Sequence, residues 1–89
     1  KRDFDKAETL FQEAVELYPD EGEFVTHLGW AMFQRAPKDD EVTSAAEARI
    51  RDGIQQNPRS ERGWLFLGHL MKATGRAAEA QRQFEQSLL

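Results

Sequence analysis

Two histidines, His27 and His69, are the side chains best suited to acid–base or metal chemistry, because the chain contains no cysteine. A zinc site built on one helix needs a spacing such as His-x-x-x-His, whereas these two histidines lie in different halves of the chain. A third ligand such as Glu23 is conceivable, but nothing in the spacing favours it. We therefore expect no metal site, and we expect His69 to be half exposed or to line a binding surface.

The other groups that could do chemistry are isolated as well. The acidic run 39–41 lacks the alternating oxygen ligands and central glycine of a calcium loop, so helix capping and solvation explain it better. Ser44, Ser60 and Ser87 have no paired base, and the sequence contains no glycine-rich phosphate loop. The sequence therefore predicts a protein that is not an enzyme and that uses no metal and no cofactor.

Composition is typical of one soluble globular domain. The 89 residues are 39% hydrophobic and 31% charged, with a net charge of −4. The negative net charge argues against nucleic acid as a partner. The arginines of the second half of the chain alternate with acidic residues, as they do on a solvated helix surface. No apolar run approaches the ~20 residues that cross a bilayer, and no signal peptide is visible. We expect a cytoplasmic protein without a membrane partner.

The segments that would position these side chains repeat along the chain. One motif occurs twice, as Val25-x-x-Leu28-Gly29-x-x-Met32 and Trp64-x-x-Leu67-Gly68-x-x-Met71. A second motif occurs three times, as Ala7-x-x-x-Phe11-x-x-Ala14-x-x-x-x-Pro19, Ala46-x-x-x-Ile50-x-x-Gly53-x-x-x-x-Pro58 and Ala80-x-x-x-Phe84-x-x-Ser87. This order of residues resembles the tetratricopeptide repeat, a pair of helices that recurs every ~34 residues.

The resemblance implies an all-α fold of tandem antiparallel helix pairs, a fragment of an α-solenoid with about five helices in a right-handed superhelical stack. Capping and helix-terminating residues predict helices over residues 3–18, 20–35, 39–56, 60–75 and 77–89. A capping box of Asp20 with Glu23, caps at Asp39 or Asp40 and at Ser60, and a left-handed Gly75 set these limits. The single domain 1–89 then divides into the second helix of a truncated repeat (1–19), a repeat with an insertion (20–59) and a repeat without its last residues (60–89).

The spacing of the motifs locates the insertion. The separation of Ala46 from Ala80 equals the period of the family, but the separation of Gly29 from Gly68 exceeds that period by five positions. Ala46 also follows Gly29 at a distance five positions longer than that between Gly68 and Ala80. Five extra residues should therefore lie between the two helices of the middle repeat, as a longer polar loop over residues 36–41. Gly29 and Gly68, which lack a Cβ atom, should let a neighbouring helix come close.

In the tetratricopeptide family the first helices of successive pairs line a concave groove that holds peptides or partner helices, and the resemblance implies such a groove here. Helical phase assigns to it the residues opposite the packing faces: Thr26, Trp30, Phe33, Gln34, Arg62, Leu65, His69 and Lys72. Trp30 and Phe33 are candidate binding aromatics. The alternative is that these two rings pack against the next helix or under the long loop.

Some members of this family bind acidic peptide tails through a clamp of Lys, Asn and Arg in the groove. The corresponding places here hold mainly apolar residues, and only Arg62 and Lys72 supply positive charge. We therefore expect a non-catalytic scaffold, part of a larger protein, that binds an amphipathic helix or an extended peptide with aliphatic anchors. The alternative is self-association through exposed end faces, because helix 3–18 carries an apolar stripe too wide for one neighbour, with Leu10 and Leu17 in it.

Overall fold

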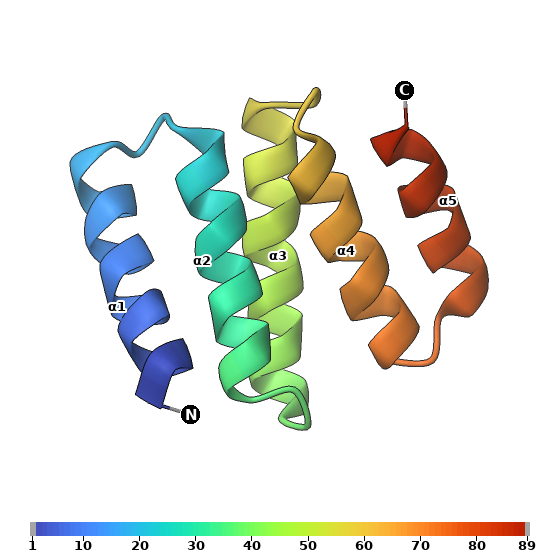
Figure 1. Cartoon of the computed structure of the whole chain (residues 1–89), viewed down its shortest axis with the longest axis horizontal. Helices are drawn as coiled ribbons and strands as arrows, with labels where there is room; N and C mark the ends of the chain where they lie inside the picture. The colour runs from blue at the N-terminus through green and yellow to red at the C-terminus, as the bar shows by residue number, and fades with distance from the viewer. Residues whose placement is uncertain (1, 89) are drawn as a thin grey trace.

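The computed structural model describes residues 2–88, and all regular structure in that range is helical. The five helices are α1 (Arg2–Leu17), α2 (Gly22–Arg35), α3 (Asp40–Gln56), α4 (Glu61–Ala73) and α5 (Ala77–Ser87). Figure 1 shows consecutive helices running antiparallel, with α1 and α5 at opposite edges. The prediction of an all-α domain with five helices is confirmed, and the helix ends lie within two residues of the predicted ones. In residues 2–88, no helix combines the length and the apolar character needed to cross a membrane.

Each helix packs against the next one along the chain, and α2 also contacts α4. The helix α2 therefore has three neighbours, whereas α1 and α5 each pack on one. The largest side chains of the core belong to the three inner helices and are at most 1% exposed; they are Leu28, Ile50, Leu67, Leu70 and Met71. The core thus lies between α2, α3 and α4, and the two edge helices cover its sides.

Glycines set the distance between the two helices of each pair. A Cβ atom on Gly29 would lie 2.7 Å from the carbonyl oxygen of Ala46 and 2.8 Å from Cγ1 of Ile50. On Gly68, a Cβ atom would lie 2.6 Å from the ring of Phe84. Both distances are far inside van der Waals contact, so the predicted close approach is confirmed. The two sites differ in one respect, since Gly29 faces the backbone of α3 whereas Gly68 faces a side chain of α5.

Three of the predicted helix signals are present. The side chain of Asp39 accepts a hydrogen bond from the backbone N–H of Val42, at 3.1 Å, and caps α3. The hydroxyl of Ser60 accepts one from the N–H of Gly63, also at 3.1 Å, and caps α4. Gly75 has a φ of 83°, the left-handed conformation that closes α4.

The predicted capping box at the start of α2 is wrong. The N-terminal capping position is Glu21, and no side chain among the described residues caps it. Asp20 lies instead inside a turn, which is closed by a hydrogen bond from the N–H of Glu21 to the carbonyl of Tyr18. The carboxylate of Glu23 reaches a different partner, because it accepts a hydrogen bond from Asn57.

The five extra residues of the middle helix pair do not form one longer loop, and that expectation is wrong. Helix α2 continues six residues beyond Gly29, and α4 continues five beyond Gly68. The connections after them have four and three residues, and α3 begins six residues before Ala46 whereas α5 begins three before Ala80. One extra residue therefore extends α2, one lengthens the loop and three extend the start of α3. Acidic side chains favour this early start, because they stabilise the first turn of a helix.

Ion pairs link the helices at their surface. Glu47 on α3 accepts hydrogen bonds from Arg76, at 2.5 Å, and from Arg51, at 3.0 Å. Burial raises the pKa of the Glu47 carboxyl, but hydrogen bonds from the two arginines and their charges outweigh it and leave the pKa below its usual value. On the other side of the domain, Arg35 on α2 pairs with Glu8 on α1. Arg35 thus joins α2 to α1, where it pairs with Asp5 as well as with Glu8, and Arg76, in the turn before α5, joins that turn to α3.

Candidate functional site

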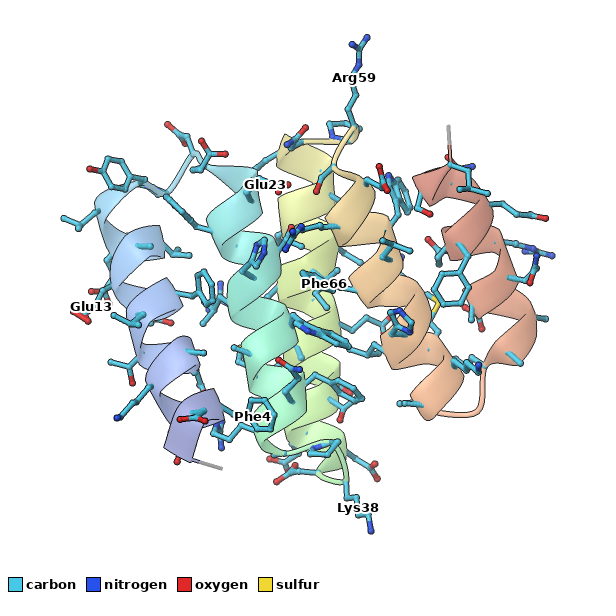
Figure 2. All side chains as sticks on the ribbon, in the orientation of Figure 1. Phe4, Glu13, Glu23, Lys38, Arg59 and Phe66 are labelled. Atoms are coloured by element: carbon cyan, nitrogen blue, oxygen red, sulfur yellow. The ribbon has the colours of Figure 1, made fainter. Side chains whose placement is uncertain are left out.

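Aromatic rings form a continuous band across the domain, here called the aromatic band. Its members are Phe11, His27, Phe66, Trp30, His69 and Phe84, from α1, α2, α4 and α5. At its centre the indole of Trp30 stacks on Phe66, with ring centroids 4.7 Å apart and planes 3° from parallel. Figure 2 shows Phe66 between α2 and α4, the two helices that this stack joins. The band therefore fixes the relative position of α2 and α4.

The two histidines belong to this band. The His27 ring lies 5.2 Å from Phe11 and 5.3 Å from Phe66, between centroids. Its Nδ1 is 2.7 Å from the carbonyl oxygen of Glu23, and since a carbonyl only accepts, Nδ1 carries the proton. His69 is exposed and lies against Trp30 and Phe84. Within residues 2–88, no three His, Asp or Glu side chains gather to hold a metal ion.

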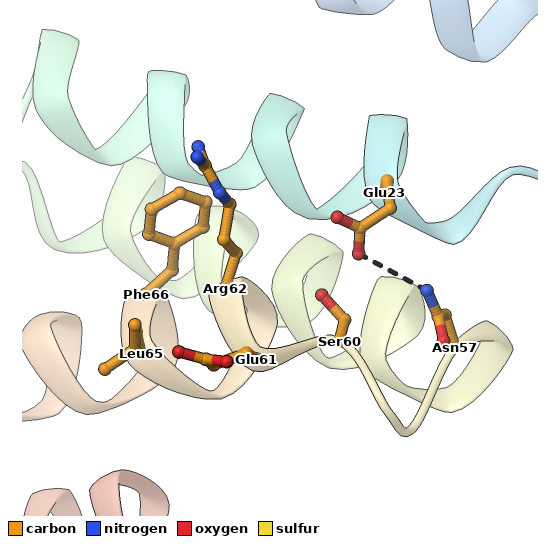
Figure 3. Close-up of a pocket in the computed structure, with 7 residues that line it drawn as sticks. All are labelled: Glu23, Asn57, Ser60, Glu61, Arg62, Leu65 and Phe66. Carbon is orange, nitrogen blue, oxygen red and sulfur yellow. Dashed lines mark hydrogen bonds between the residues drawn. The ribbon is translucent and has the colours of Figure 1, made fainter. Parts of the chain in front are cut away.

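An open pocket of about 740 Å³ lies beside the N-terminal ends of α2 and α4. Figure 3 shows its lining residues, which are Glu23, Asn57, Ser60, Glu61, Arg62, Leu65 and Phe66. Leu65 and Phe66 give it an apolar surface, while Glu23, Glu61 and Arg62 place both signs of charge around that surface. Figure 3 also shows Arg62 and Phe66 pointing toward α2. Such an arrangement suits an apolar anchor flanked by a charged group.

The residues predicted on α4 lie on one face of that helix. Arg62 and Leu65 line the pocket, His69 lies in the aromatic band, and Lys72 is exposed one turn further on. The spacing of three or four residues between them keeps them on the same side. Phe66, which belongs to both the pocket and the aromatic band, connects this face to Trp30 of α2.

The residues predicted on α2 are placed differently. Thr26 is 0% exposed, and Phe33 is only 7% exposed, so neither is available to a partner, and their assignment to the groove is corrected. Trp30 and Gln34 are half-buried. The physical reason is that Thr26 and Phe33 follow Gly22 and Gly29 by four residues and so lie on the side of α2 that faces α3; a Cβ atom on Gly53 of α3 would lie 2.8 Å from the backbone nitrogen of Thr26. For Phe33 and for much of Trp30, the alternative of internal packing is the observed one.

Phe66 was not selected as a site residue from the sequence, although it is the most central ring. The sequence did contain a signal for it. The motif that begins at Val25 recurs at Trp64, and Phe66 stands in the second copy where His27 stands in the first. Two rings at one position of a repeat indicate a row of aromatic side chains along successive helices. Asn57 was missed as well, since it lies in the turn after α3 and gave no periodic signal.

A comparison with known protein families finds no match for this chain, and neither does a comparison with curated proteins.

Proposed function

We propose that this chain is a non-catalytic scaffold that binds a partner peptide or helix along the exposed face of α4 and the adjoining edge of α2. The observation that carries the proposal is the pocket between these helices, where the half-buried Leu65 and Phe66 are bordered by Glu23, Glu61 and Arg62. An apolar anchor would fit against Leu65 and Phe66, and polar groups of the ligand would meet the rim.

The resemblance to the tetratricopeptide repeat supports the same function. It relates the pairs α2–α3 and α4–α5 as successive repeats of a right-handed α-solenoid, with α1 as the second helix of a preceding pair. The proposed face then corresponds to the inner groove of that family. The match is strongest where Gly29 and Gly68 occupy the close-contact position of the motif in both pairs.

A peptide selection tests this proposal. A displayed library of random peptides, each long enough for about four helical turns, would be selected on the immobilised chain. The affinity of the enriched peptides would then be measured for variants of the face. Leu65→Asp removes the apolar anchor surface, and Lys72→Glu reverses a charge on the same side of α4. We expect Leu65→Asp to weaken binding by about tenfold or more, since burying one leucine contributes about 1.5–3 kcal/mol.

Leu88→Asp is the matched control, because Leu88 is 84% exposed and lies outside this face, beyond the end of α5. It should leave the affinity unchanged. Enriched peptides whose affinity is the same for wild type and for Leu65→Asp would place the binding surface elsewhere and refute the proposal.

A further inference from the structure

The exposed face of α4 carries its charged side chains at its two ends. Glu61 and Arg62 stand in the first turn and Lys72 stands in the last, and all three are exposed. At 1.5 Å per residue, Glu61 and Lys72 are roughly 16 Å apart along the helix axis. Leu65 lies between them and lines the pocket together with Phe66. The face therefore presents an apolar patch with a charged group on either side of it.

Three of these residues form one row along the helix. At about 100° of rotation per residue, Glu61, Leu65 and Lys72 fall within about 40° of each other around α4. Arg62 lies about 60° beyond them, on the side of α2. Figure 3 shows this division, because Arg62 and Phe66 point toward α2 whereas Glu61 lies beside Leu65. From the pocket to the C-terminal end of α4, the row is acidic, then apolar, then basic.

The charges of this face are not neutralised by ion pairs within the described part of the chain. None of the ion pairs among the described side chains includes Glu61, Arg62 or Lys72. Across the pocket, the carboxylate of Glu23 accepts a hydrogen bond from the uncharged Asn57. The pocket thus has two carboxylates and one guanidinium, hence a net charge of −1, and the far end of the row has the positive charge of Lys72.

The apolar part of the face is short. Leu65 and Phe66 are half-buried and form one patch, whereas the next exposed positions toward the C-terminus of α4, His69 and Lys72, are polar. An amphipathic helix would need apolar contacts over several turns. An extended segment needs only one anchor at this patch, and every second side chain of such a segment points to the same side. The face therefore favours an extended ligand.

We propose that the face of α4 binds an extended segment in which a basic, an apolar and an acidic residue stand two positions apart. This ligand class presupposes the function proposed above and concerns the same site. The basic residue lies at Glu61 and Glu23, the apolar residue lies on Leu65, and the acidic residue lies at Lys72. The outer two residues of such a segment are about 13 Å apart, and the long side chain of Lys72 covers the remaining few ångströms.

The order of charges separates this ligand from segments with two like charges. A segment with two acidic residues would place one of them against Glu61 and Glu23, and a segment with two basic residues would place one against Lys72. Each exposed attraction or repulsion of this kind changes affinity by a factor of about 1.5 to 5. Because a segment can run in either direction along α4, the basic residue can come first or last in its sequence.

Three synthetic peptides test the proposal. The probes are GGKSFSEGG, GGESFSEGG and GGKSFSKGG, acetylated and amidated so that their termini carry no charge. Nuclear magnetic resonance titration of the intact ¹⁵N-labelled chain measures their dissociation constants, including weak ones. We expect GGKSFSEGG to bind about threefold or more tightly than the other two, since each of those exchanges one attraction for a repulsion. The largest shifts should lie at Leu65 and Phe66.

Charge reversal in the chain identifies the residues responsible. Lys72→Glu should make GGKSFSKGG the preferred peptide, and Glu61→Lys should make GGESFSEGG the preferred one. The controls are Leu10→Asp and Leu17→Asp, because Leu10 is 65% exposed and Leu17 is 73% exposed on α1, which packs only on α2 among the described helices. They should leave all three affinities unchanged. Circular dichroism checks that each variant keeps its helical content.

Leu65→Asp separates this proposal from the function on which it depends. If Leu65→Asp weakens all three peptides but charge reversal leaves their order unchanged, the ligand class is wrong and the binding face stands. Charges that serve only to stabilise the ends of α4 would give that result. If Leu65→Asp changes none of the affinities, the proposed face fails as well. Equal affinities of the three peptides, or no saturable binding by any of them, would also overturn the ligand class.

Discussion

Replacing Gly29 by alanine tests whether the close approach of α2 to α3 holds the fold together. Alanine improves helix propensity by about 1 kcal/mol, so on local grounds the substitution should stabilise the protein. Its methyl group, however, would lie 2.7 Å from the carbonyl oxygen of Ala46 and 2.8 Å from Cγ1 of Ile50. Both residues are 0% exposed, and a backbone carbonyl inside a helix cannot turn away. The helices must therefore move apart.

The size of the effect follows from these two opposing contributions. Overpacking of a tight core costs about 1–3 kcal/mol, and a clash with backbone belongs at the upper end of that range. After the gain in propensity, Gly29→Ala should lower the free energy of unfolding by about 2 kcal/mol. For a domain of this size that loss lowers the melting temperature by roughly 8–16 °C.

Gly68→Ala is the matched control in the other helix pair. Its methyl group would meet the ring of Phe84, which is half-buried on the edge helix α5 and can move outward. Overpacking at the low end of the range, about 1 kcal/mol, is offset by propensity, so Gly68→Ala should change stability by less than about 0.5 kcal/mol. Urea denaturation followed by far-ultraviolet circular dichroism measures both variants. Equal stabilities, or a Gly29→Ala variant more stable than wild type, would refute the reasoning.

Three further variants test the local interactions by denaturation. Asp39→Ala removes the cap of α3 and should cost about 1 kcal/mol, whereas Asp20→Ala, which removes no cap, should have little effect; equal losses would contradict the assigned caps. Trp30→Ala should cost about 3 kcal/mol through the loss of its stacking and core contacts; an unchanged stability would mean that the ring is not packed. Because Glu47 has a lowered pKa in the folded state, it stabilises the fold above its unfolded pKa, and acidification removes this contribution. Glu47→Gln should therefore be less stable than wild type at pH 7 by about 1 kcal/mol, and the difference should shrink as the pH falls below the ordinary pKa of a glutamate and vanish below the lowered pKa of the folded state; a constant difference would exclude the ion pairs as its source.

The helices and their contacts could be predicted because their signals are local. Glycine, proline and capping residues set the helix limits, and the shared spacing of Gly29 and Gly68 anticipated the close approach in both pairs. The capping residue of α2 could not be chosen locally, because Asp20 and Glu21 are adjacent acidic candidates and a turn beginning at Tyr18 decides between them. The extra residues of the middle pair were misplaced for a similar reason, since Asp40 and Glu41 suit a loop and a first helical turn equally well.

The candidate site was harder to predict, because the exposure of a side chain depends on how many neighbouring helices surround the helix that carries it. Helical phase gives the side opposite a known neighbour, and that side is solvent only when there is no second neighbour across from it. Lys72 and His69 on α4 are exposed, but Thr26 on α2 is fully buried. Thr26 is buried because it faces α3, beside Gly53. The contact of α2 with α4 covers part of another side of α2 and brings together Trp30 and Phe66, which are far apart in the sequence.

The difference between inner and edge helices also bears on how the proposed peptide-binding face of α4 would work. Residues 3–17 of α1 are all exposed or half-buried, and the buried part of α5 is limited to Ala80. Opening of these edge helices removes little core, so it requires less free energy than separating α2, α3 and α4. The aromatic stack and pocket proposed for peptide binding are anchored on the inner helices, and they are therefore held rigid before a ligand arrives.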